Sequence, residues 1–343
     1  MTIDMHSHWR PPALIDLLRA RTEAPLIETS DDGVEVLRGR SGGTEPVSEA
    51  FDNLEERLAV MDRQGISTAV LSLFGTFQWI EALPLEESLA MLRVHNDALA
   101  EICAAHPGRF VAYASLPLVD QAAALEEFDR VMGIDGFIGA IVPGNAFLTY
   151  KDAEAFRPYL ETANRHSAVL FVHWGPRPGD AWPRVTPEAD NASARLFTLD
   201  MQASLSADMM TLCYSDLLEE YPDVRIHIHN LGGNIPYEVE RLDHRNALDT
   251  PDEPMPSSRL VKPHLYVDCN SLGAQAIECG VAAYGASRIM LGTDGTEFGC
   301  EWSVKALKEA RIDDAARHAI LHGNAARFLG HLATLALYQE AAE

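Results

Sequence analysis

Eight short apolar runs, rich in β-branched residues, recur along the chain, and the segments between them carry apolar residues at helical spacing. The runs are almost continuously hydrophobic, which is typical of parallel strands that are covered on both faces. Alternating strands and helices predict repeated βαβ units, and eight such units favour an α/β fold of the closed (β/α)8 TIM-barrel type. The predicted strands are Thr2–Met5, Thr68–Leu73, Phe110–Leu116, Phe137–Val142, Val169–Val172, Val224–Ile228, Leu265–Asp268 and Arg288–Leu291.

The length of 343 residues fits one large α/β barrel, so a single domain spanning residues 1–343 is expected. Residues 28–48 form a connection too long for an ordinary strand-to-helix loop and carry turn residues, which predicts a small β-hairpin flap over the barrel mouth, after the first strand. The predicted helices are Asn53–Arg63, Leu85–His106, Ala122–Met132, Asp152–Arg165, Asp208–Glu220, Gln275–Tyr284, Ser303–Glu309 and Asp313–Leu329.

Charge and composition exclude several classes of partner. The chain has 27 Lys and Arg against 51 Asp and Glu, a net charge of −24, which repels nucleic acid and anionic membranes. Its 5 cysteines show no CxxC spacing, which disfavours a disulfide framework or a cysteine-rich zinc site. No signal peptide is evident, and no apolar run reaches the roughly 18 residues of a membrane span. A cytoplasmic protein with no nucleic-acid or membrane partner is therefore expected.

The most informative motif is Asp4-Met5-His6-Ser7-His8, which continues the first predicted strand. Side chains at positions i and i+2 of an extended strand point to the same side, so His6 and His8 direct two imidazoles at one point. A single metal ion requires this arrangement from a pair of nitrogen ligands. Two solvated histidines in a polar segment are the alternative interpretation.

Two further candidate ligands follow other predicted strands. His173 follows the fifth strand, and Asp294 follows the eighth in Gly292-Thr293-Asp294-Gly295. Taken alone, His173 would be interpreted as a hydrogen-bonded core residue and Asp294 as a turn former. Active-site groups of a TIM barrel come from the carboxyl ends of its strands, where both residues stand. Together with the two N-terminal histidines they favour a site of three histidines and one aspartate.

These motifs resemble the amidohydrolase superfamily, and within it the aminocarboxymuconate-semialdehyde decarboxylase-like group. The resemblance runs nearly end to end. Its motifs are Ile-Asp-x-His-x-His at Ile3–His8, Phe-Val-His at Phe171–His173, Leu-Gly-Thr-Asp at Leu291–Asp294, and Gly-Asn-Ala-x-x-Phe-Leu-Gly at Gly323–Gly330.

The resemblance implies that His6, His8, His173 and Asp294 hold one divalent metal ion, with a water molecule in an open position. Zinc is the favoured ion and manganese the alternative. The resemblance does not fix the reaction, because the relatives include decarboxylases, C–C bond hydrolases and hydratases.

The sixth strand departs from the family pattern, in which a histidine that commonly acts as acid or base precedes Gly-Gly by one residue. In the run His227–Gly233, alignment on the glycines puts Asn230 in that place. Alternation along the strand separates Asn230 from His227 and His229. Either a bulge after Ile228 turns His229 toward the site, or Asn230 faces it and cannot carry a proton. We favour His229 as catalytic and expect His227 to be structural or exterior.

An anionic substrate needs a positive group to bind this acidic protein, and arginine is suited to bidentate carboxylate binding. Arg38, on the predicted flap, stands near a carboxylate-binding arginine of the decarboxylase, if a one-residue gap is allowed; a solvated loop residue is the alternative. Arg10 and Arg177 are rivals for the role. Trp174 and Asn230 complete the predicted substrate-binding set. The Trp-rich stretch of the decarboxylase is absent, so a different substrate is expected.

The favoured function is a metal-dependent, non-oxidative decarboxylase of a small unsaturated or aromatic carboxylic acid. In this hypothesis the metal and Arg38 orient the acid, while His229 and Asp294 move the proton. A metal-dependent hydrolase of a C–C, lactone, ester or amide bond, or a hydratase, is the alternative. A non-catalytic, metal-containing barrel is less favoured, because structural zinc sites are usually cysteine-rich and closed by four protein ligands. A homodimer is expected, as the commonest symmetric assembly.

Overall fold

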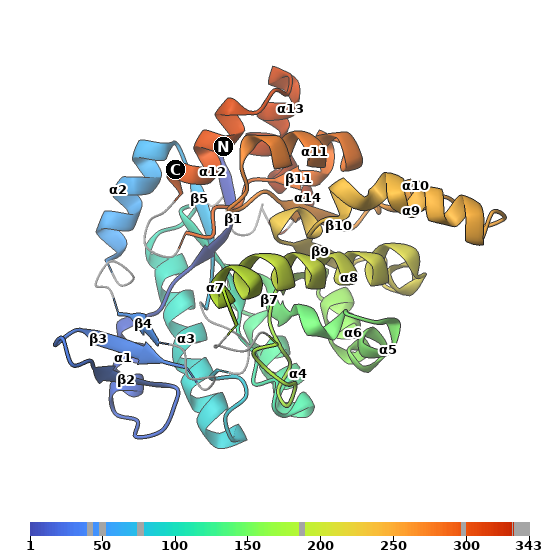
Figure 1. The fold of residues 1–343 in the computed structure, drawn as a ribbon. Helices are drawn as coiled ribbons and strands as arrows, with labels where there is room; N and C mark the ends of the chain where they lie inside the picture. The colour runs from blue at the N-terminus through green and yellow to red at the C-terminus, as the bar shows by residue number, and fades with distance from the viewer. Residues whose placement is uncertain are drawn as a thin grey trace.

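The computed structural model describes residues 1–39, 44–47, 53–73, 79–184, 189–295, 300–330 and 332. Eight parallel strands form one sheet in the order β1-β5-β6-β7-β8-β9-β10-β11, with helices arranged around it (Figure 1). The strands are β1 (Ile3–His8), β5 (Thr68–Ser72), β6 (Phe110–Ala114), β7 (Phe137–Pro143), β8 (Val169–His173), β9 (Arg225–Ile228), β10 (Leu265–Asp268) and β11 (Ile289–Met290).

Backbone hydrogen bonds join the last strand and the segment after it to β1. The amide of Met5 donates to the carbonyl of Leu291 at 2.9 Å, and the amide of His8 donates to the carbonyl of Gly295 at 3.0 Å. A parallel bridge pairs Ser7 with Gly295. The sheet thus curls back on its first strand, which confirms the predicted (β/α)8 TIM barrel.

The helices follow the strands in the chain, and the last three come after β11. The α-helices are α1 (Pro12–Arg19), α2 (Leu54–Gln64), α3 (Leu85–Ala105), α4 (Gln121–Val131), α5 (Tyr150–Ala155), α6 (Arg157–Arg165), α7 (Ala192–Ala194), α8 (Met201–Tyr214), α9 (Ile235–Asp249), α10 (Pro256–Arg259), α11 (Ala274–Tyr284), α12 (Glu301–Glu309), α13 (Asp314–His318) and α14 (Asn324–Leu329). Short 3-10 or π segments are η2 (Gly144–Ala146), η3 (Arg195–Asp200), η4 (Leu217–Glu220), η5 (Asn230–Gly232), η6 (Ala286–Arg288) and η7 (Ala319–Gly323). In the part of the chain that the structure describes, no helix is both long enough and apolar enough to cross a membrane.

A register shift in β1 determines which of its side chains enter the barrel. Asp4 pairs with Ala69 and Ser7 with Leu71, so three steps along β1 match two along β5. Met5 therefore packs in the barrel interior and the next residue, His6, also faces inward, whereas Asp4 and Ser7 face helix α2. The strand also extends three residues beyond its predicted end at Met5, so it includes both histidines of the motif.

The segment after α1 forms a three-stranded antiparallel sheet in the order β2-β3-β4, in which β2 and β3 form a β-hairpin and β4 is an additional strand that was not predicted. Its strands are β2 (Leu26–Thr29), β3 (Glu35–Arg38) and β4 (Thr44–Pro46). The third strand is short, polar and ends in proline, so alternation could not identify it. Apolar side chains of α1, β2 and β3 pack against Leu73 and Trp79, which follow β5, and this contact places the sheet on the carboxyl side of the barrel. Residues 40–43 and 48 of the predicted flap lie outside the described residues.

Candidate metal centre

The structure brings together all four residues that the sequence suggests as metal ligands. His6 and His8 come from β1, His173 ends β8, and Asp294 follows β11. One ligand atom from each residue lies within 4.8 Å of the others. The Nε2 atoms of His6 and His8 are 3.1 Å apart, and Oδ1 of Asp294 lies 3.4 Å and 3.2 Å from them. These distances give the four donors a common centre at the carboxyl end of the barrel.

The second ring nitrogen of each histidine faces a hydrogen-bond acceptor outside this centre. The Nδ1 pairs are His6 with Asp268 Oδ2 at 3.0 Å, His8 with Ser72 Oγ at 2.9 Å, and His173 with the carbonyl oxygen of Trp174 at 3.0 Å. The Ser72 hydroxyl itself donates to the carbonyl of Ser7 at 3.4 Å, which leaves its oxygen free to accept. These partners assign the protons to Nδ1, so the three Nε2 lone pairs are available to one cation.

The charges around the centre also favour a cation. Burial by itself lowers the pKa of His6, but the carboxylates of Asp294 and Asp268 outweigh burial and raise this pKa above its ordinary value. Burial would raise the pKa of Asp294, yet His6 and His8 hold it well below its usual range. An ionised carboxylate together with imidazole nitrogens is a donor set that suits a divalent ion such as zinc or manganese.

Asp268, at the end of β10, is a site residue that the sequence reasoning missed. Its Oδ2 accepts from His6 Nδ1 and lies 2.8 Å from His227 Nε2, while Oδ1 accepts the backbone amide of Asn270 at 3.0 Å. A carboxylate behind a ligand histidine fixes the ring and its tautomer. A Cβ on Gly292 would lie 2.6 Å from Cγ of Asp268, so the glycine before Thr293 makes room for it. The rule that site residues end barrel strands could have found Asp268, because it ends the predicted strand.

The inner face of β9 is the face that carries His227 and His229. Strands β8 and β9 pair in regular register, with Phe171 opposite His227 and Val172 opposite Ile228. The ring of His227 stacks on Phe171 at 4.3 Å between centroids and is fully buried. His227 is therefore a structural residue inside the barrel, not an exterior one, and no bulge is needed to bring His229 inward. Both faces of a barrel strand are buried, so hydrophobicity alone does not identify the inner one.

His229 lies beside the four candidate ligands. Its ring stacks on His173 at 4.5 Å with an interplanar angle of 5°. Its Nε2 accepts the backbone amide of Trp174 at 2.9 Å, and its Nδ1 lies 3.0 Å from the side-chain amide of Asn230. Burial first, and then the charge of His6, lower the pKa of His229 to about 3. The ring is consequently neutral at pH 7, and Asn230 contacts His229.

The residues predicted to bind substrate have different surroundings. Arg10 is only 1% exposed, with its guanidinium 5.8 Å from the ring centroid of Trp79. The side chain of Arg38, on β3, is 48% exposed and pairs with Glu28 of β2. Trp174 is buried and packs edge-on against Trp182 at 4.7 Å.

Arg177 is held between two carboxylates. Its guanidinium lies 2.9 Å from Asp152 and 3.2 Å from Asp180, and all three residues line an open groove beside Phe156 and Tyr159. The positive charge of Arg177 is thus already balanced by protein groups.

Comparison with known proteins gives relatives that match about four fifths of the chain. Gamma-resorcylate decarboxylases from Rhizobium sp. (strain MTP-10005) and Rhodococcus jostii (strain RHA1) are 28% identical over 290 residues and 29% identical over 300 residues. These matches cover 81% and 80% of this chain, and 87% of each relative. A 2-amino-3-carboxymuconate-6-semialdehyde decarboxylase from Dictyostelium discoideum is 22% identical over 283 residues, which cover 80% of this chain and 76% of that protein.

Solved structures with the same fold include a 2,6-dihydroxybenzoate decarboxylase complexed with 2,6-dihydroxybenzoate. It has a TM-score of 0.73 and 25% identity, over 96% of this chain and 98% of that one. A dihydroxybenzoic acid decarboxylase from Polaromonas sp. JS666, with bound manganese and the inhibitor 2-nitroresorcinol, has a TM-score of 0.69 and 23% identity over 96% of both chains. The family model described as Amidohydrolase matches residues 3–331. The family suggested by the motifs is therefore confirmed, and this chain belongs to the amidohydrolase family.

Proposed function

We propose that this protein is a metal-dependent, non-oxidative decarboxylase of a small aromatic carboxylic acid. One observation carries the proposal: His6, His8 and His173 turn their Nε2 atoms toward Asp294 at the carboxyl end of the barrel, while their Nδ1 atoms are held from behind. The curated relatives that cover four fifths of this chain are decarboxylases, which supports the class of reaction.

His6, His8, His173 and Asp294 would together hold one divalent ion. Zinc is the first choice, because three imidazoles and one carboxylate suit it, and manganese is the second. When bound, the ion would polarise oxygen atoms of the substrate and hold them in a fixed orientation.

Arg10 is the arginine that we assign to the substrate carboxylate. It stands two residues after His8, just beyond the end of β1 at the carboxyl end of the barrel. It is buried, whereas Arg38 on β3 is half exposed. Arg177 lines the open groove beside Phe156 and Tyr159. Arg10 therefore takes the place that the sequence reasoning gave first to Arg38.

His229 and Asp294 are assigned the transfer of the proton. A proton is added to the ring carbon that bears the carboxylate, and the bond between that carbon and the carboxylate then breaks. The electron pair of the broken bond restores the aromatic ring, and carbon dioxide leaves. One proton replaces one carboxylate, so the reaction needs no oxidant. His229 can take up a proton once its Nε2 is released from the backbone amide of Trp174, and a well-placed group of this kind contributes about 10²–10⁴-fold in rate.

The test is a decarboxylation assay with the protein loaded with zinc or with manganese. Hydroxybenzoic acids, 2,6-dihydroxybenzoate among them, and muconate-type acids are incubated without oxidant, and carbon dioxide and the product are measured. We expect one carbon dioxide per substrate consumed, loss of activity with a chelator, and its return on adding metal. Asp294→Asn is expected to abolish turnover. Cleavage without carbon dioxide would replace the proposal by a hydrolase, and no turnover of any acid by metal-loaded protein would refute it.

The proposed assembly is a homodimer in the cytoplasm. Closed two-fold symmetry is the commonest arrangement among soluble oligomers. Light scattering coupled to gel filtration should give twice the chain mass of 37.7 kDa, and a single-chain mass would contradict the dimer.

A further inference from the structure

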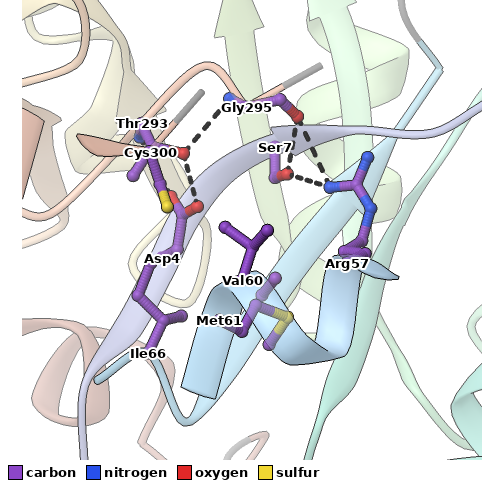
Figure 2. A pocket seen from close by; sticks show the side chains of 10 residues that line it. Asp4, Ser7, Arg57, Val60, Met61, Ile66, Thr293, Gly295 and Cys300 are labelled. Carbon is purple, nitrogen blue, oxygen red and sulfur yellow. Dashed lines mark hydrogen bonds between the residues drawn. The ribbon is translucent and has the colours of Figure 1, made fainter. Parts of the chain in front are cut away.

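A cluster of polar side chains lies on the outer face of β1, on the opposite side of the strand from the histidines. We call Asp4, Ser7, Arg57, Thr293 and Gly295 the seam cluster, because they lie where β1 meets the segment after β11 (Figure 2). The cavity that they help to line has a volume of about 20 Å³, which has room for about one water molecule. The cluster is therefore too tightly packed to bind a substrate, and its polar groups must serve one another.

Arg57, from helix α2, connects both sides of the seam. Its Nη2 donates to the carbonyl of His8 at 2.7 Å, and its Nη1 donates to Ser7 Oγ at 2.8 Å and to the carbonyl of Gly295 at 3.5 Å. Ser7 Oγ in turn donates to the same Gly295 carbonyl at 2.8 Å. Arg57 is only 4% exposed, so these bonds are made away from bulk water, where a charged donor is strong. The Arg57 guanidinium thus links His8, a candidate ligand, to Gly295, the residue after Asp294.

Asp4 holds the other side of the same segment. Its carboxylate accepts the backbone amide of Thr293 at 3.0 Å and the Thr293 hydroxyl at 2.6 Å. The amide of Gly295 donates to Thr293 Oγ1 at 3.1 Å. The residues immediately before and after Asp294 are consequently both fixed by groups on the outer face of β1.

Asp294 itself has a backbone that needs such support. Its φ angle is +56°, in the left-handed region that residues with a side chain seldom adopt. Such a conformation persists only where the surroundings impose it. The amide of Asp294 also donates to the carbonyl of His6 at 2.8 Å. A left-handed residue at this point directs the carboxylate into the barrel, toward His6 and His8.

We propose that the seam cluster is a positioning device for the metal centre, in which Asp4 and Arg57 hold the segment around Asp294 so that its carboxylate meets the histidines. Asp4 and Arg57 are positioning residues, because they act through Asp294 and the backbone of His8. The inference rests on the ligand set of the proposed function, but it does not depend on which reaction the centre catalyses.

The test compares Arg57→Met with Arg57→Lys and measures metal binding, not turnover. The dissociation constant for Zn²⁺ is obtained by competition with a chelator, and the visible spectrum of Co²⁺-substituted protein reports the geometry of the ligands. Loss of a group that orients metal ligands typically weakens metal binding about 10- to 100-fold. We expect a loss of that size and an altered Co²⁺ spectrum in Arg57→Met. Arg57→Lys keeps a donor for the His8 carbonyl and is expected to recover part of the affinity.

Arg109→Met is the matched control. Arg109 also joins helix α2 to the barrel, through Asp62 at 2.7 Å and the carbonyl of Ser67 at 2.9 Å, but at the amino end of the strands. This variant loses a similar link and should bind Zn²⁺ with the wild-type affinity. A merely structural role for Arg57 would lower the unfolding temperature of Arg57→Met and leave its zinc affinity and Co²⁺ spectrum unchanged.

Ser7→Ala decides the matter if Arg57→Met does not fold, because it removes only one hydroxyl from the seam cluster. The inference would be overturned if the Arg57 variants had the zinc affinity and Co²⁺ spectrum of the wild type. If Arg57→Met does not fold, the same result in Ser7→Ala would overturn it. Neither result would affect the proposed function. A wild-type protein that binds no divalent ion would instead overturn the ligand set itself, and with it the proposed function.

Discussion

The carboxylates of Asp268 and Asp294 both lie beside His6, but they face different nitrogen atoms of its ring. Asp268 lies behind the ring, where it accepts from Nδ1, whereas Asp294 lies on the Nε2 side with the other candidate ligands. Asp268 thereby fixes a proton on Nδ1, so the neutral ring has its lone pair on Nε2, on the side of Asp294. The position of a single proton follows from residues that are far apart in the sequence.

Arg10 offers a prediction at this scale, because its assignment competes with that of Arg38. A charge-assisted hydrogen bond is worth about 1.5–3 kcal/mol, so Arg10→Met should raise KM for an aromatic acid about 10- to 100-fold. Arg38→Met removes an exposed arginine of the same type and serves as the control, with KM expected to stay within about twofold, as is usual for surface charges. Steady-state kinetics on both variants measures the difference. A large rise in KM for Arg38→Met, with little change for Arg10→Met, would show that Arg38 on β3 binds the substrate carboxylate.

Helices α3 and α4 are joined to each other and to β6 by one buried polar group. Glu127 of α4 accepts from Arg130 at 2.7 Å, from Asn96 at 2.9 Å and from Arg93 at 3.1 Å. Asn96 also exchanges two hydrogen bonds of 3.0 Å with the backbone of Ser115, just after β6. This cluster fixes α3 and α4 against the carboxyl end of β6.

The pH dependence of this link can be predicted. Burial alone would raise the pKa of Glu127, but the hydrogen bonds from Arg130, Asn96 and Arg93 outweigh burial and lower it below its ordinary value. A lowered pKa in the folded state means that the stabilisation is present above the unfolded-state pKa and is lost as pH falls through the folded-state pKa. Glu127→Gln should therefore be about 1–3 kcal/mol less stable than wild type at pH 7.

Urea unfolding at a series of pH values from 7 down to 3 measures this difference. The difference in the free energy of unfolding between wild type and Glu127→Gln should shrink as the pH falls, because the wild-type carboxyl then becomes neutral as well. Glu126→Gln, an exposed position on the same helix, should differ little from wild type throughout. A gap that stays constant with pH would show that the charge of Glu127 does not contribute.

The helices and strands were predicted well where the hydrophobic pattern of the sequence is strong, and less well where that pattern does not show which residues are buried. All eight barrel strands were predicted close to their bounds, because long apolar runs between helices leave few alternatives. Helix α9 was not predicted, since only Ile235 of its residues is buried and its apolar stripe is weak. The inner face of β9 was also unpredictable, because Ile228 and His229 are both buried and alternation does not say which side is inside.

The residues of the candidate site also fall into those that the sequence could predict and those that it could not. His6, His8, His173 and Asp294 could be predicted because each has a side chain able to bind a metal, in a barrel strand or shortly after one. Arg57 could not, since its role depends on a helix that packs against the outside of β1, and no local pattern reports such a contact. Long-range hydrogen bonds of this kind require the three-dimensional structure.

The whole molecule carries a net charge of −24, and this charge affects how an anionic substrate approaches. Salt shortens the range of the repulsion, from a Debye length of about 30 Å at 0.01 M to about 8 Å at 0.15 M. We therefore expect kcat/KM for an aromatic carboxylate to rise about two- to fivefold across this range, with kcat nearly unchanged. Initial rates in an inert salt series test this. The inhibition constant of the uncharged product should not change with salt, and a fall in kcat/KM would indicate a locally positive entrance.

The positions of His6 on β1 and Asp294 after β11, near opposite ends of the chain, also determine when the candidate metal centre can form during synthesis. A ribosome delivers His6 long before Asp294, so the nascent polypeptide lacks the carboxylate proposed to complete the ligand set until the eighth strand has emerged. A chain released early would keep its paired histidines and have no partner for them. With the proposed ligand set, the complete centre can therefore form only late in synthesis, after β11 and the segment that follows it have emerged.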